Sequence, residues 1–308
     1  MRQSFVDTII DLAKNNKNLF LLTGDLGFSV FEGFKKQFPK RFFDVGVAEQ
    51  NMIGVAAGLA LSGKTVFVYS IIPFATMRCF EQIRNDLCMQ DLDVKIVGMG
   101  AGLHYGTAGS THHAIEDISI MRSLPNMTVI CPATPEDTRN AFRAAMLRKG
   151  PVYIRLGKSH GILDCKSKQR FSVGKASLIK NGDDITIIAS GAILYDAKEC
   201  ADYLLKNNNI KTRLINMHTI KPIDKNIILK ASKETKAIFS VEEHSIIGGL
   251  GSAIAEVLAQ SKNKALFKIF GLPDAYPKSF GDRNYLLKKS GLSAMKMASD
   301  ILKVLRGR

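Results

Sequence analysis

The amino-acid sequence predicts an α/β protein with two domains, a larger one built on a mostly parallel sheet and a smaller α/β domain after it. A length of 308 residues suits about two domains of ordinary size. Short apolar runs alternate with helix-like segments, the pattern typical of βαβ units and parallel sheets. A polar, lysine-rich stretch at 157–169 interrupts this alternation, which then resumes. We therefore expect domains at residues 1–160 and 175–308, joined by a linker at 161–174.

The first elements are a helix at Ser4–Asn15 and a strand at Leu19–Leu22. Asp25 follows that strand, so we expect its side chain at the carboxyl edge of the sheet, where ligands of open α/β sheets gather. A loop and helix at Phe28–Phe38 come next, and Pro39 ends the helix.

The clearest unit is strand, helix, strand. Apolar runs at Phe42–Val45 and Val66–Tyr69 flank a proline-free run of helix formers, Ala48–Leu61, and Gly63 stands where a helix C-cap is expected. Short joins make this a βαβ unit with parallel strands and a right-handed crossover. Glu49 is the only carboxylate in the helix and lies in its first turn, just past a strand's carboxyl end.

Two interpretations of Glu49 are open from the spacing. It is either a first-turn acid favoured by the helix dipole or a functional acid. The helix is apolar nearly all round, so we expect it to be buried, and a carboxylate at its head to be desolvated, the usual setting of a functional acid. Ala56, Ala57 and Gly58 permit close packing against another element or another subunit.

The rest of the first domain continues the alternation. Pro73 indicates a loop after the strand that ends at Tyr69, and Thr134 is a plausible N-cap. The expected elements are a helix at Arg78–Gln90, strands at Val94–Val97, Thr128–Cys131 and Val152–Leu156, and a helix from Pro135 to about Arg148.

A glycine-rich loop at Ala101–Glu116 follows the strand Val94–Val97. Its histidines, His104, His112 and His113, invite a metal interpretation. No cysteine or carboxylate stands at the usual ligand spacing, however, so we do not predict zinc.

The second domain is expected to contain strands at Ile185–Ala189, Lys211–Asn216 and Ala237–Val241, with helices at about Ala192–Lys206 and after Lys221–Asp224. The glycines at 248, 249 and 251 precede a helix, which allows either a phosphate cradle or a structural turn.

Composition narrows the functional class. The net charge of +15 allows a solvated basic surface, an anionic substrate or an acidic partner, and no Arg-rich arm points to nucleic acid. Five scattered cysteines without a CxxC indicate reduced thiols and a cytoplasmic location. The start of the chain does not resemble a signal peptide, and the longest uncharged runs fall short of the ~20 residues that a membrane span needs.

Two motifs carry a resemblance to a known family. DVGVAEQNMIGVAAGLALSG, residues 44–63, closely resembles the pyrimidine-binding domain of thiamine-diphosphate enzymes of the transketolase family, which includes 1-deoxy-D-xylulose 5-phosphate synthase. SVEEHSIIGGLGSAIAEVL, residues 240–258, resembles the C-terminal domain of the same family, where the glycine-rich turn is structural. The resemblance extends over roughly residues 4 to 304. It implies a pyrimidine-binding fold followed by a transketolase C-terminal domain, with Glu243 and His244 as scaffold residues.

The resemblance also implies roles for single residues. Glu49 matches the glutamate that hydrogen-bonds the aminopyrimidine N1′ and promotes the imino tautomer that deprotonates the thiazolium C2. His112 matches a histidine that reaches the reacting substrate, where imidazole can donate to a developing alkoxide and shuttle protons. Phe74 matches a ring that stacks on the aminopyrimidine, with a plain core residue as the alternative; Ile71 stands where a second phenylalanine is usual. The implied cofactor contacts are Asp25, Glu49, Ile53, Ile71 and Phe74.

The substrate half departs from the family pattern. Ala108 stands where an aspartate recognises the sugar, and Gly100 replaces a basic residue that touches the sugar or its phosphate. His104 and His113 are unusual additions that we place at the substrate. Arg155 matches an arginine that holds a substrate phosphate; a buried arginine paired with a carboxylate is the alternative. We therefore do not expect ordinary pentose-phosphate sugars.

The family's Gly-Asp-Gly motif, which holds Mg²⁺ and the diphosphate, does not occur in this sequence. The resemblance thus implies one subunit of a split enzyme, inactive alone. Its partner would be an N-terminal transketolase subunit that carries the metal, in a heterotetramer of two copies of each subunit in which this chain also self-associates. The implied reaction transfers a two-carbon ketol or acyl unit from a small sugar or 2-oxo donor to an aldehyde, in carbohydrate metabolism. The alternatives are the β subunit of a 2-oxo acid dehydrogenase and a non-catalytic scaffold.

Overall fold

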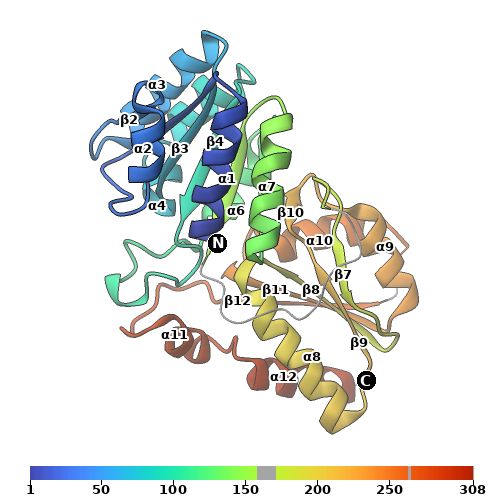
Figure 1. Ribbon diagram of the computed structural model, residues 1–308. Coiled ribbons are helices and arrows are strands. Elements are labelled where there is room, and N and C mark those ends of the chain that lie inside the picture. The colour runs from blue at the N-terminus through green and yellow to red at the C-terminus, as the bar shows by residue number, and fades with distance from the viewer. Residues whose placement is uncertain (158–170, 263–264, 308) are drawn as a thin grey trace.

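The computed structural model describes residues 1–157, 171–262 and 265–307 (Figure 1). Within them the first sheet has seven strands in the order β10-β5-β6-β4-β3-β1-β2, and neighbouring strands are parallel except β10 and β5. Its strands are β1 Leu19–Thr23, β2 Phe42–Asp44, β3 Thr65–Ile71, β4 Val94–Met99, β5 Thr128–Ile130, β6 Val152–Leu156 and β10 Thr219–Lys221. The predicted parallel βαβ unit around Glu49 is confirmed.

Helices cover both faces of this sheet, and its central strands β3, β4 and β6 are accordingly buried along almost their whole length and mostly apolar. On one face α1 packs against α7, where Phe5 stacks on Phe142 with ring centroids 4.6 Å apart. On the other face α3 contributes Met52, Ile53 and Ala56 to a hydrophobic core that also includes Val66 and Val68. The helices are α1 Arg2–Asn15, α2 Glu32–Gln37, α3 Glu49–Leu61, α4 Ile72–Thr76, α5 Phe80–Gln82, α6 Asp117–Ser123 and α7 Pro135–Leu147.

Two local predictions in this half need correction. The segment around Pro73, expected to be a loop, is the helix α4. A proline is tolerated in the first turn of a helix, because the N–H that it lacks would have no intrahelical partner at that position. The single helix expected at Arg78–Gln90 is instead the short α5 followed by a π-helical segment, Ile83–Cys88. Such π-helical turns are frequent near functional sites.

The second sheet has the order β12-β11-β8-β9-β7 within the described residues, with β7 antiparallel to β9. Helices α8 and α12 pack together, as do α9 and α10 (Figure 1). The strands are β7 Ser177–Lys180, β8 Ile185–Ser190, β9 Thr212–Asn216, β11 Ala237–Ser245 and β12 Leu266–Leu272; the helices are α8 Leu194–Asn208, α9 Lys225–Glu234, α10 Leu250–Ala259, α11 Arg283–Lys289 and α12 Ala294–Arg306. The two-domain α/β fold with mostly parallel sheets is thus confirmed.

Strand β10 joins the two halves. It follows β9 in the chain but pairs antiparallel with β5 of the first sheet, through Thr219 opposite Ile130. The main-chain N–H of Cys131 extends this pairing by donating to the carbonyl of His218, 2.8 Å away. The domain limits 1–160 and 175–308 stay a prediction, and most of the expected linker, 161–170, lies outside the described residues. No helix in the described part of the chain is both long and apolar enough to span a bilayer.

Candidate functional site

Glu49 lies buried at the start of α3. Gly46, at φ +76°, turns the chain between β2 and α3 so that the helix begins at the carboxyl edge of the sheet. The Glu49 side chain is 1 % exposed. Its Oε1 accepts a hydrogen bond from Ser70 Oγ at 2.8 Å, and its Oε2 pairs with Arg78 Nη1 at 2.6 Å. One hydroxyl and one cation therefore satisfy this buried carboxylate.

Arg78 connects Glu49 to an aromatic ring. Its guanidinium lies over the Phe74 ring, 4.5 Å from the centroid, while the same group pairs with Glu49. A side chain exposure of 39 % keeps Arg78 in contact with solvent. The sequence motifs did not single out Arg78. Arg78 lies in the turn that follows α4, and no local sequence signal marks it.

His112 is the next member of the group. Its ring meets Phe74 edge to face, with centroids 5.2 Å apart, and Thr111 Oγ1 lies 3.0 Å from its Nδ1. The Tyr105 ring also lies near, with its centroid 6.1 Å from that of His112 and 5.2 Å from that of His104. The fold thus gathers Glu49, Phe74 and His112, from α3, α4 and the 101–116 loop, into one continuous group.

Of the other residues predicted for the site, some lie beside this group and others lie farther from it. Ile53 is fully buried one turn after Glu49, and Ile71 is partly buried at the end of β3, beside α4. Asp25 is exposed and adopts a left-handed backbone, with its N–H donating to Asp44 Oδ1. Ala108 is exposed within the loop.

His113 points into the base of the loop. It is 3 % exposed, and its Nε2 lies 3.0 Å from the carbonyl oxygen of Gly106. Its Nδ1 has no partner among the described residues.

Arg155 is buried away from the group. It forms a bidentate pair with Asp117, at 2.7 and 3.2 Å, and its Nη2 also donates to the carbonyls of Ala114 and Glu243. Burial opposes the charge, but the ion pair with Asp117 outweighs it and raises the pKa of Arg155. Since the side chain is only 3 % exposed, the structure favours the buried, carboxylate-paired alternative over a phosphate ligand.

Metal ligands and reactive thiols do not collect at this site. In the parts of the chain that the structure describes, no three or more histidine, cysteine or carboxylate side chains are arranged to hold a metal. Cys79, near the group, is buried; desolvation raises the pKa of its thiol to about 12, which disfavours the nucleophilic thiolate.

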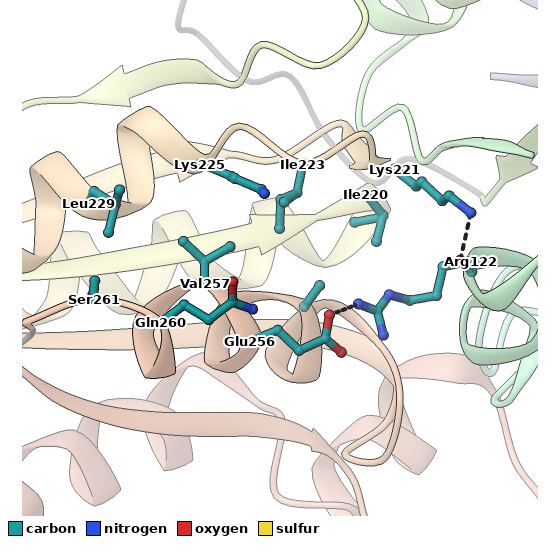
Figure 2. Close-up of a pocket in the computed structure, with 11 residues that line it drawn as sticks. Arg122, Ile220, Lys221, Ile223, Lys225, Leu229, Glu256, Val257, Gln260 and Ser261 are labelled. Atoms are coloured by element: carbon teal, nitrogen blue, oxygen red, sulfur yellow. Dashed lines mark hydrogen bonds and ion pairs between the residues drawn. The ribbon is translucent and has the colours of Figure 1, made fainter. Parts of the chain in front are cut away.

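A separate pocket of about 450 Å³ lies between α9, α10 and β10 (Figure 2). Two of its cations are engaged: Arg122 pairs with Glu256 at 2.6 Å, and the Lys221 ammonium donates to the carbonyls of Arg122 and Leu124. None of the residues that the sequence singled out for the site lines this pocket, so it is distinct from the group around Glu49.

Comparisons with known proteins agree with both halves of the fold. Residues 1–161 match the family model described as the pyrimidine-binding domain of transketolase, and residues 174–297 match the transketolase C-terminal domain. A protein of Methanocaldococcus jannaschii named as a putative transketolase C-terminal section is 43 % identical, over 99 % of this chain and 96 % of the relative. One of the subunits of an apulose-4-phosphate transketolase of Phocaeicola vulgatus is 39 % identical, over 89 % of this chain and 87 % of the relative.

One solved structure covers nearly the whole chain. It is described as a split gene transketolase, inactive beta4 tetramer, and is 39 % identical with a TM-score of 0.90. The match extends over 99 % of this chain and 98 % of the solved chain.

Proposed function

The chain belongs to the transketolase family, and we propose that it is the cofactor-activating subunit of a split, thiamine-diphosphate-dependent enzyme. The proposed reaction transfers a two-carbon ketol unit to an aldehyde acceptor. The observation that supports this most is the continuous contact from Glu49 through Arg78 and Phe74 to His112. A buried acid, a stacking ring and an imidazole lie together at the carboxyl edge of the sheet.

The chemistry of this group fits an aminopyrimidine. The Arg78 guanidinium, a flat group with N–H donors, is accommodated between the Glu49 carboxylate and the face of Phe74. A flat heterocycle with a donor for Glu49 would make the same two contacts once Arg78 moves aside. We assign Glu49 to the pyrimidine nitrogen, Phe74 to stacking, and Ile53 and Ile71 to apolar contact. When bound, the cofactor supplies a stabilised carbanion for breaking and forming carbon–carbon bonds.

His112 is proposed to act on the substrate. The contact at Nδ1 with Thr111 and the edge of Phe74 orient its ring, and Nε2 is the nitrogen that we assign to the substrate oxygen. An imidazole whose ring is held in this way can donate a hydrogen bond to an oxygen on which negative charge develops.

The substrate is proposed to lie along the 101–116 loop. A cavity of about 370 Å³ is lined by residues 104–107 and 282–284, next to Tyr105 and hence close to His112. Histidine, threonine and asparagine side chains there suit the hydroxyl groups of a small sugar. We place His104 and Ala108 at the substrate, and we assign His113 and Arg155 to holding the loop.

A partner subunit is proposed to complete the site. This chain has no Gly-Asp-Gly motif, so the partner would hold Mg²⁺ and the diphosphate. The exposed face of α3 offers a contact surface together with the residues before it, because Leu61 at the end of the helix is 65 % exposed and Val47, just ahead of its start, is 68 % exposed. A Cβ at Gly54 or Gly58 on this helix would meet no atom within 4 Å. We propose that this face mediates self-association in a heterotetramer.

Calorimetry of thiamine diphosphate with Mg²⁺ tests the proposal. The chain alone should bind weakly, and a mixture with a subunit that carries a Gly-Asp-Gly motif should bind tightly and turn over ketose donors. Glu49→Gln should abolish turnover in the mixture, whereas Glu81→Gln, at an exposed carboxylate of α5, should not. Full turnover by Glu49→Gln would support the scaffold alternative. Turnover of 2-oxo acids in place of ketoses would support the dehydrogenase alternative.

A further inference from the structure

The loop that carries His104, Tyr105 and His112 is closed at its base by its own main chain. The N–H of Gly102 donates to the carbonyl of Ala114 at 3.0 Å, and the N–H of Ala114 donates back to Gly102 at 2.9 Å. The residues between them form the part of the loop that reaches the candidate site. The position of this base therefore sets where the His112 ring lies.

Glu243, near the end of β11 in the second domain, binds that base. Its carboxylate is 4 % exposed. Oε1 accepts the main-chain N–H of Leu103 at 2.8 Å, and Oε2 accepts from Arg283 Nε at 2.8 Å and Nη2 at 2.6 Å. One buried carboxylate thus links the first residues of the loop to α11.

Further contacts fix the other end of the base to the same strand. The N–H of Ser245 donates to the carbonyl of Ile115 at 2.8 Å. Arg155 Nη2 bridges the carbonyls of Ala114 and Glu243, at 2.8 and 3.0 Å. Both ends of the loop are therefore held by the end of β11, although the loop belongs to the first domain.

The backbone of Gly102 and the side chain of Glu243 fit closely against each other. Gly102 has φ +63°, and a Cβ on it would lie 2.3 Å from Glu243 Cγ. Only a residue without a side chain lets the carboxylate reach the loop N–H at this distance. The buried charge of Glu243 is in turn compensated by Arg283, as buried charges require.

We propose that Glu243 is a positioning residue through which the second domain sets the location of His112 relative to the cofactor pocket. It touches neither cofactor nor substrate and acts through the loop. A misplacement of reacting groups by about 1 Å can cost ~10²-fold in rate, so a tether at the loop base has a direct kinetic consequence. The effect of Glu243 on the reaction rate rests on the proposed function, whereas its contacts with the base of the loop do not.

The first experiment measures the tether in the chain alone. Hydrogen–deuterium exchange of peptides covering 101–116 is compared for wild type, Glu243→Ala, Glu243→Gln and Asp196→Asn. Asp196 is the matched control, because it also pairs with Arg283, at 3.4 Å, but forms no hydrogen bond with the loop within the described residues. We expect exchange at least tenfold faster in the loop for Glu243→Ala, a smaller increase for Glu243→Gln, which keeps an acceptor, and no change for Asp196→Asn. Unchanged exchange in both Glu243 variants, or equal acceleration in Asp196→Asn, would overturn the proposal.

The second experiment uses the assembled enzyme. We expect Glu243→Gln to lower kcat by ~10- to 100-fold and to raise KM, since the same loop carries His112 and His104 and Arg283 lines the substrate cavity, while the thiamine-diphosphate Kd stays within about twofold. Equal loss of cofactor binding and kcat would indicate general damage and overturn the positioning role. If the wild-type complex turns over no sugar, the proposed function fails, and the exchange experiment still decides whether Glu243 holds the loop.

Discussion

Removal of the Arg78 charge is the sharpest test of the geometry around Glu49, and it needs neither cofactor nor partner. In Arg78→Met the aliphatic stem remains while the Glu49 carboxylate, 1 % exposed, keeps only its hydrogen bond from Ser70. A buried carboxylate then has no counter-charge.

The expected decrease in the free energy of unfolding lies between two limits. Exposed ion pairs contribute roughly 0–1 kcal/mol, and breaking a buried pair costs roughly 3–5 kcal/mol. Since Arg78 is 39 % exposed and Glu49 is buried, we expect about 2 kcal/mol from the pair. The contact with the face of Phe74 adds roughly 0.5–1 kcal/mol.

Urea unfolding of the isolated chain measures this cost as a shift in the midpoint without a change in the m value. A double-mutant cycle with Glu49→Gln isolates the pair: in that background Arg78→Met should cost only the Phe74 contact, which leaves a coupling of about 2 kcal/mol. Arg84→Met is the matched control, an exposed arginine on the adjoining π-helical segment that bonds only its neighbour Asn85 among the described residues. A coupling near zero would refute the idea that Arg78 compensates the buried carboxylate.

Four further outcomes are expected. In the assembled enzyme Arg78→Met should tighten thiamine-diphosphate binding by about thirtyfold, measured by calorimetry, because an ion pair worth ~2 kcal/mol no longer has to open. Burial lowers the pKa of His218 to about 4, so between about pH 6.5 and pH 4 the unfolded chain binds a proton at this residue and the folded chain does not. The free energy of unfolding should therefore fall by up to ~3 kcal/mol as the pH is lowered from 6.5 to 4. Urea titrations at several pH values should show this fall, and His218→Gln should remove that part of it. Gly102→Ala should destabilise the chain by about 3 kcal/mol in the same assay, because the left-handed backbone and the close approach of Glu243 both oppose a methyl group. Val55→Glu, on the exposed face of α3, should dissociate any self-assembly of the chain in sedimentation experiments while changing the stability of the monomer by less than ~0.5 kcal/mol.

Local sequence patterns were sufficient for the part of the fold that places Glu49. The strand–helix–strand unit was predictable because its strands are mostly apolar and its helix has no breaker. The burial of Glu49 was expected with it, although α3 is buried along one face only and not nearly all round. The loop predicted at Pro73 was wrong because a proline breaks a helix only beyond its first turn, and sequence alone does not fix where the turn begins.

Features that depend on distant parts of the chain were not predictable. Strand β10 has three residues, and its strand character comes from pairing with β5, which is remote in sequence. Arg78, in the turn between α4 and α5, resembles any solvated cation until the fold brings it to a buried carboxylate. Arg155 fitted two interpretations equally, and only its pairing with Asp117 distinguishes them.

Strand β10 also has a consequence for how the protein is made. The strands of the first half are all synthesised once β6 ends at Leu156. The strand that pairs with the outer edge of β5, however, is β10, and it is complete only when Lys221 has left the ribosome. At ~5–20 residues per second, β5 then presents an open edge for several seconds of synthesis, and open edges pair readily with other chains. The nascent first half is therefore the form of this protein that we expect to depend most on chaperones.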